Sequence, residues 1–161
     1  MLRCCSYRSP LGALLLAADE GALAGLWMEG QRFFGRPYGE ALPQPTEPEG
    51  ALALAVRWLD AYFAGEKPSS EDLPLAPRGT AFQQRVWQEL CLIPYGTTCT
   101  YGELARRLGS SARAVGGAVG RNPLCIIVPC HRVLAAGGDL GGYAGGVARK
   151  RFLLAWEERQ S

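Results

Sequence analysis

Long apolar runs are missing from this sequence of 161 residues. No stretch approaches the roughly 18 apolar residues that a membrane-spanning helix needs, so we expect no membrane span. Leu11–Ala18 follows two arginines and ends in alanines, as the apolar part of a signal peptide does. However, Asp19-Glu20-Gly21 closes this run, and a second apolar run, Ala22–Met28, follows. Two short runs around an acidic turn with glycine favour a β-hairpin over a signal peptide.

Metal-binding patterns are scarce as well. The chain has one histidine, His131, and its six cysteines show no CxxC spacing. Zinc sites take their ligands from closely spaced cysteines and histidines, so we expect no metal. The six cysteines would allow three disulfides, but Cys4 and Cys5 are adjacent, which makes pairing awkward. Reduced thiols in a cytoplasmic protein are the simpler interpretation.

An overall excess of one charge sign is also absent, because the formal net charge is only +2. The positive charge is local instead. Residues 95–135 contain one acid, Glu103, and five arginines, which are Arg106, Arg107, Arg113, Arg121 and Arg132. A cationic segment in a nearly neutral protein fits a polyanionic partner. An ordinary solvated face has the same charge pattern, so charge alone leaves both interpretations open.

The apolar fraction of 48% is sufficient for a packed core, and we expect an α/β fold with two lobes. The first lobe has a small antiparallel sheet, predicted from strands at Arg3–Ser9, Ala13–Ala18 and Ala22–Glu29. An amphipathic helix follows over Glu49–Phe63, with Gly65 as its stop and Leu52, Val56, Leu59 and Phe63 on its buried face. We place the N-terminal lobe at residues 1–67, a proline-rich linker at 68–79 and a mostly helical C-terminal domain at 80–161.

Two capping boxes mark helices in the C-terminal domain. In the first, the side chains of Thr80 and Gln83 bond each other's backbone N–H groups, and the helix buries Phe82, Val86, Trp87 and Leu90. The second runs from Thr100 to Glu103 and opens a helix that ends near Gly109. Ser110 or Ser111 then caps a helix that runs to about Arg121. This pair is either a DNA-binding helix-turn-helix or a plain helical hairpin, and the pattern does not choose between them.

Three glycines in the last of these helices favour an external partner. They are Gly116, Gly117 and Gly120, and each costs roughly 1 kcal/mol relative to alanine in a helix interior. Close approach of the backbone to another surface is the usual reason for such glycines. With Arg113 near its start and Arg121 at its end, the helix fits a nucleic-acid backbone.

An apolar run, Leu124–Val128, predicts a buried strand that leads into Pro129-Cys130-His131-Arg132. A cysteine is nucleophilic as its thiolate and needs a nearby base, and His131 is the only histidine. Neighbouring side chains of a strand point to opposite faces, so a bridging water or a kink after Pro129 is needed. Glu157, on a helix predicted over about Val147–Arg159, is the candidate acid to orient His131. We expect that helix to bury Phe152, Leu153 and Trp156.

Several motifs in a fixed order resemble the O6-alkylguanine-DNA alkyltransferase family. The match is dense from Thr80 to Glu157 and loose in the first lobe, where only Ser9–Gly12 fits. The motifs are the RAVGGA helix at Arg113–Ala118, the hinge Asn122-Pro123, the PCHR element within Ile127–Val133, the pocket loop Gly142–Gly146 and the closing helix Lys150–Glu157.

The resemblance implies a DNA repair protein that acts without a cofactor. It would reverse O6-alkylguanine, and O4-alkylthymine as well, by irreversible transfer of the alkyl group to Cys130. The implied partner is double-stranded DNA containing alkylated guanine, bound through the minor groove by a monomer. The first lobe is implied to be ribonuclease-H-like.

Roles for individual residues also follow from the resemblance. His131 takes the thiol proton through water and Glu157 orients it, while Tyr101 donates a hydrogen bond to the departing guanine. Asn122 braces the turn, and Arg113 fills the gap left by the flipped nucleotide. The other residues implied are Ala114, Gly116, Gly117, Arg121 and Arg132 for DNA contact, and Val133, Tyr143, Ala144 and Gly145 for the substrate pocket.

Three features depart from some members of the family. Ala144 stands where some have serine, so contact to the base oxygen falls to backbone N–H groups. Cys125 stands where some have a second proline, which leaves the acceptance of bulky alkyl groups open. The zinc-binding histidines of some first lobes are missing.

Two other functions stay open: a non-catalytic module that binds alkylated DNA, and a Cys–His hydrolase acting on small molecules.

Overall fold

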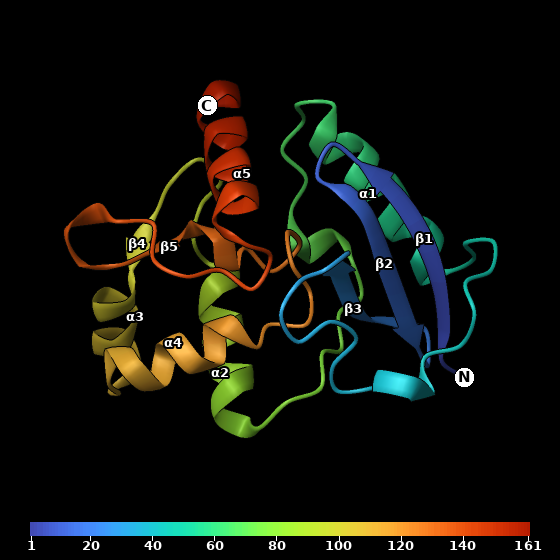
Figure 1. Cartoon of the computed structure of the whole chain (residues 1–161), viewed down its shortest axis with the longest axis horizontal. Coiled ribbons are helices and arrows are strands. Elements are labelled where there is room, and N and C mark those ends of the chain that lie inside the picture. The colour runs from blue at the N-terminus through green and yellow to red at the C-terminus, as the bar shows by residue number, and fades with distance from the viewer. The chain divides into compact units, whose positions relative to one another are not determined.

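The computed structural model describes all 161 residues, and these form two compact units. The first unit contains residues 1–78 together with 123–127, and the second contains residues 79–122 and 128–161. The first holds a sheet with a helix, whereas the second is mostly helical (Figure 1). The predicted α/β class is therefore confirmed. None of the helices combines the length and the apolar composition that crossing a membrane requires.

The sheet of the first unit has three antiparallel strands in the order β1-β2-β3. They span Arg3–Ser9 (β1), Gly12–Asp19 (β2) and Ala22–Met28 (β3), within a residue of the predicted strands. Asp19 pairs with Ala22, so β2 and β3 are joined by the two residues Glu20 and Gly21, both with positive φ. A two-residue turn with positive φ at both positions matches the right-handed twist of antiparallel strands. The predicted β-hairpin is therefore confirmed.

Helix α1 (Ala51–Phe63) contacts all three strands from one side of the sheet (Figure 1). It does not begin at Glu49 as predicted, because Gly50 at φ 54 is not helical. The predicted buried face is also partly wrong, since Val56 and Phe63 are only half-buried. The buried residues are Ala51, Leu52, Ala55, Trp58, Leu59 and Tyr62. The large rings of Trp58 and Tyr62 stack on each other, and the buried face of α1 is the face that carries these two rings.

The prediction of a strand at Leu124–Val128 is wrong, although every residue in it is buried. Leu26 of β3 donates to the carbonyl of Pro123 (2.7 Å) and accepts from the N–H of Cys125 (3.2 Å), which places this segment in the first unit. The chain then turns sharply at Ile126, whose φ is 71, and the N–H of Ile127 donates to the carbonyl of Cys125. Apolarity predicted burial here, but it did not predict the conformation.

The second unit contains four helices and one short parallel strand pair. The helices are α2 (Ala81–Cys91), α3 (Tyr101–Leu108), α4 (Ala112–Gly120) and α5 (Val147–Gln160), and the strands are β4 (Cys99–Thr100) and β5 (Val133–Leu134). Helices α2, α3 and α4 pack together. The indole N–H of Trp87 donates to the carbonyl of Ala118 (2.9 Å), which joins α2 to α4.

The predicted caps account for where these helices begin. Both bonds of the Thr80–Gln83 box are present, at 3.1 and 3.0 Å. At Thr100 only half of the box forms, because the Glu103 carboxylate accepts from the threonine hydroxyl rather than from its backbone N–H. Gly109, in the left-handed conformation, ends α3, and the Ser111 hydroxyl caps α4. The two short helices joined by a turn that contains glycine are thus present as predicted.

The buried face of α5 differs from the prediction. Leu153 is buried, but Phe152 and Trp156 are only half-buried and stack on each other. The other buried residues of α5 are Lys150 and Glu157. Two ionisable side chains therefore point inward, where they serve the site described next.

Candidate functional site

Cys130 lies at a sharp turn formed by its own neighbours. Pro129 has φ −80 and ψ 65, and the Cys130 N–H donates to the carbonyl of Val128 (2.8 Å), which makes an inverse γ-turn. Residues Cys130–Arg132 follow as a single 3-10 turn, η3. The kink after Pro129 is therefore present. The side-chain amide of Asn122 donates to the same Val128 carbonyl (2.8 Å), so Asn122 fixes the point from which η3 starts.

His131 is held by Glu157 of α5. The distance from His131 Nε2 to Glu157 Oε2 is 2.7 Å, and both side chains are buried. Because the carboxylate accepts at Nε2, we assign the ring proton to that nitrogen. Nδ1 is buried and has no hydrogen-bond partner. Burial lowers the pKa of His131, with Glu157 acting in the opposite direction, so Nδ1 is an unprotonated base at neutral pH.

Arg132 does not lie on the surface with the other arginines, and this corrects its predicted place in the DNA interface. Its side chain is only about 10% exposed. Nε and one terminal nitrogen donate to the two oxygens of Glu157, at 2.7 and 3.0 Å. The other terminal nitrogen donates to the Ile93 carbonyl (2.8 Å). A guanidinium committed in this way is not free to contact phosphate.

Lys150 is a site residue that the sequence reasoning missed. Its fully buried ammonium group donates to the carbonyls of Val133 (2.6 Å) and Gly142 (3.2 Å), which joins β5 to the glycine-rich loop. Burial lowers the pKa of Lys150, while the negative charge that Cys130 carries when it is deprotonated acts in the opposite direction. The spacing of Lys150, Leu153 and Glu157, three and then four residues apart, was the available signal, because it places all three on one helical face.

The aromatic pocket residues lie around the same lysine. Lys150 Nζ is 5.9 Å from the ring centre of Tyr101 and 6.0 Å from that of Tyr143. Burial, and then the negative charge of a deprotonated Cys130, raise the pKa of Tyr101, so its hydroxyl keeps its proton at neutral pH. Val133 is buried in β5, and Ala144 and Gly145 lie in the turn before α5. The structure thus brings Tyr101, Tyr143 and Val133 together near Cys130.

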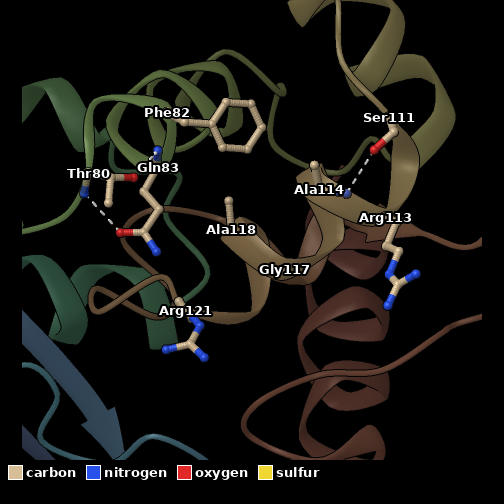
Figure 2. A pocket seen from close by; sticks show the side chains of 9 residues that line it. All are labelled: Thr80, Phe82, Gln83, Ser111, Arg113, Ala114, Gly117, Ala118 and Arg121. Atoms are coloured by element: carbon tan, nitrogen blue, oxygen red, sulfur yellow. Dashed lines mark hydrogen bonds between the residues drawn. The ribbon is translucent and has the colours of Figure 1, made fainter.

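A surface groove of about 490 Å³ runs between the start of α2 and helix α4. Figure 2 shows Phe82 and Gln83 across from Ala118, with Arg113 and Arg121 at opposite ends of the α4 segment. The other lining residues are Thr80, Ser111, Ala114 and Gly117. Both charged residues of the groove are cationic. Phe82, predicted to be buried, is half-exposed here.

The glycines of α4 differ in what surrounds them. A Cβ on Gly116 would meet the Tyr101 ring at 3.8 Å, which is ordinary contact. A Cβ on Gly117 or Gly120 would have no atom within 4 Å other than those of its chain neighbours and of the backbone of its own helix. Packing inside the protein therefore does not explain Gly117 or Gly120. Gly117, Ala114 and the two arginines share the groove, and this is the face of the helix-turn-helix that is open to a partner.

Two family models together match nearly the whole chain. The 6-O-methylguanine DNA methyltransferase ribonuclease-like domain matches residues 2–77, and the DNA binding domain of the same name matches residues 81–159. The chain belongs to the 6-O-methylguanine DNA methyltransferase family. The resemblance found in the motifs is thereby confirmed. The match to the DNA binding domain includes every residue of the site and every lining residue of the groove except Thr80, which directly precedes it.

Named relatives of high sequence identity support the same family membership. The Methylated-DNA--protein-cysteine methyltransferase of Mycobacterium leprae is 50% identical, over 99% of this chain and 94% of the relative. That of Methanosarcina acetivorans is 48% identical, over 94% of this chain and 95% of the relative. The crystal structure of Mycobacterium tuberculosis OGT in complex with DNA is 47% identical, covers 99% of this chain and 94% of that one, and has a TM-score of 0.84.

Proposed function

We propose that this 6-O-methylguanine DNA methyltransferase family member repairs double-stranded DNA by moving the alkyl group of O6-alkylguanine onto Sγ of Cys130. The observation that carries the proposal is the unpartnered Nδ1 of His131, a neutral base held by Glu157 one residue from a buried cysteine. A DNA-binding module that does not react has no use for such a base. O4-alkylthymine, whose alkyl group is also on an exocyclic oxygen, is a second substrate of the same chemistry.

The transfer begins with deprotonation of the cysteine. The Cys130 thiol gives its proton to Nδ1 of His131 through a water molecule, and Glu157 stabilises the imidazolium that forms. The thiolate then attacks the alkyl carbon, a carbon–sulfur bond forms, and the carbon–oxygen bond breaks with its electron pair going to guanine. Tyr101 donates a hydrogen bond that stabilises the guanine anion as it departs, and the anion is neutralised by one proton from water, which takes up in exchange the proton that His131 received from the thiol. The buried Lys150 ammonium adds positive charge beside the same groups.

The helix-turn-helix groove is proposed to face the DNA. Arg121 contacts phosphate, while Gly117 and Ala114 let the backbone of α4 approach closely. Arg113 enters the duplex and replaces the flipped nucleotide. Tyr143, Ala144, Gly145 and Val133 line the pocket that receives the base. By function we assign residues 80–161 to this DNA-binding and transfer domain, residues 1–67 to the ribonuclease-H-like lobe and residues 68–79 to the linker, although residues 68–78 and 123–127 pack with the first unit. We propose a monomer.

No disulfide joins the six cysteines, and thiols in this state support a cytoplasmic location, where thiols stay reduced. Oxidation would inactivate a protein whose nucleophile is a thiolate. A monomer of this kind needs no metal or cofactor for the steps above, because the thiol, the base and the hydrogen-bond donor all come from its own side chains.

A single-turnover titration tests the proposed function. The product is a thioether, which water does not hydrolyse as it does a thioester. Product should therefore stop at one alkyl group per protein, with a mass increase on Cys130 equal to that group. Cys130→Ala should remove the transfer and keep the DNA binding. Product that rises past the protein concentration would favour a Cys–His hydrolase, and binding without a mass increase would favour a non-catalytic module.

A further inference from the structure

Arg132 and His131 share one carboxylate, and this sharing has consequences for the histidine. Glu157 Oε2 accepts from His131 Nε2 (2.7 Å) and from a terminal nitrogen of Arg132 (3.0 Å). Glu157 Oε1 accepts from Arg132 Nε (2.7 Å) and from the backbone N–H of Gly96 (3.3 Å). The guanidinium thus holds both oxygens as a fork, which is the strong geometry for an arginine and a carboxylate.

A buried histidine beside a lone carboxylate is driven towards the charged imidazolium, because the negative charge stabilises the added proton. Here the charge of Glu157 is already neutralised by Arg132. A protonated His131 would leave two cations, His131 and Arg132, on one anion inside the protein, with the Lys150 ammonium as a third positive group on the same side. The arrangement therefore disfavours protonation of His131 in the resting protein.

We propose that Arg132 is a positioning residue that keeps His131 neutral, with its proton on Nε2 and its lone pair on Nδ1. The fork holds Glu157 in one orientation, and Glu157 in turn fixes the tautomer of the ring. The Ile93 carbonyl and the Tyr95 ring, which lies 5.4 Å from the guanidinium carbon, hold Arg132 itself in place. Its link to alkyl transfer rests on the proposed function, in which Nδ1 is the base.

The charged and titratable groups that face this pair come from three places. Glu157 and Lys150 belong to α5, Arg132 and Cys130 belong to η3, and Tyr95 follows α2. Glu157 is the one carboxylate among them, and burial and then the negative charge of Glu157 raise the pKa of Tyr95, so that the Tyr95 hydroxyl keeps its proton. Burial lowers the pKa of His131, and the charges of Arg132 and Lys150 lower it further. Without Arg132, the negative charge of Glu157 is no longer neutralised and acts on His131 directly, which raises the pKa of His131.

The single histidine of the chain makes this testable by nitrogen NMR, because every imidazole signal belongs to His131. In the wild-type protein at pH 7 we expect a neutral ring protonated at Nε2. Arg132→Gln should raise the pKa of His131 by about one unit or more, a tenfold change in its proton affinity. Arg132→Lys keeps the charge but not the fork, so its shift should be smaller. Arg151→Gln removes an exposed arginine of α5 and should change nothing.

Two results would overturn the proposal. One is a wild-type His131 that is charged at pH 7 or protonated at Nδ1, a result that needs no variant to fold. The other is an Arg132→Gln protein that is folded and titrates at His131 like the wild type. The pH profile of single-turnover alkyl transfer separates this proposal from the proposed function. The acidic limb of this pH profile should move together with the pKa of His131 measured by NMR. An NMR shift without a shift of that limb would support the role of Arg132 and refute His131 as the base.

Discussion

Substitution of Gly117 by alanine should stabilise the protein and weaken its binding to DNA. Gly117 lies inside α4, and an added Cβ would meet no atom within 4 Å from outside the local backbone of its own helix. The substitution therefore gains the helix preference of alanine, about 1 kcal/mol, without a packing cost. For a chain of this size that gain raises the melting temperature by about 2–4 °C.

The same methyl group should disturb the DNA interface. Gly117 lines the groove between Arg113 and Arg121, so a Cβ there would occupy space that the DNA backbone needs. Overfilling a close contact costs about 1–2 kcal/mol, which is roughly a 5- to 30-fold loss of affinity. A natural sequence that keeps glycine here gives up stability for function, as binding sites commonly do.

Gly120→Ala is the matched control. Gly120 belongs to the same helix and also has open space where a Cβ would lie, but it does not line the groove. It should raise the melting temperature by less, because it is the last residue of α4, and should leave DNA affinity unchanged. Circular dichroism gives the melting temperatures, and fluorescence anisotropy with an unmodified duplex at fixed salt gives the affinities. If Gly117→Ala bound DNA as well as the wild type, the assignment of the groove to DNA would be refuted.

Three further predictions concern other parts of the second unit. Arg113→Ala should slow the repair of duplex DNA much more than the reaction with a free alkylated base, since a free base needs no flipping; equal losses would place Arg113 in the fold or the pocket. Lys150→Met should lose about 1–3 kcal/mol of stability in urea unfolding and should slow alkyl transfer, because the carbonyls of Val133 and Gly142 lose their buried donor; unchanged values of both would refute its role. Stability should also fall as the pH drops below about 6.5, because burial lowers the pKa of folded His131 and the unfolded chain takes up the proton first. The slope should approach 1.4 kcal/mol per pH unit, and a flat profile between pH 7 and 5 would contradict it.

The sequence predicted the regular elements well because their local signals agree with the fold. The two short apolar runs around Glu20-Gly21 and the capping residues Thr80 and Ser111 set boundaries that the structure keeps. It failed at Leu124–Val128, where an apolar run between two prolines turns instead of extending. Conformations of this kind depend on partners such as Leu26, which are distant in the sequence.

The polar half of the site was predicted only in part. Cys130, His131 and Glu157 lie where the motifs placed them, although the roles assigned to them stay predictions. Arg132 and Lys150 were not predicted to be buried, because hydrophobic periodicity assigns charged residues to the surface. They are buried because each finds partners there: Glu157 for Arg132, and two backbone carbonyls for Lys150. Pairings of this kind arise from the tertiary structure and leave no pattern along the chain.

Residues 123–127 affect how this protein can be divided. The chain passes from one unit to the other three times, after residues 78, 122 and 127, so the two units are not separate lengths of sequence. A fragment cut at the linker would keep Leu124–Ile127 but lose the strand, β3, to which that segment is bonded. Four apolar side chains that are buried in the whole chain would then be exposed to water. A second unit expressed alone would therefore need polar replacements at these four positions to stay in solution.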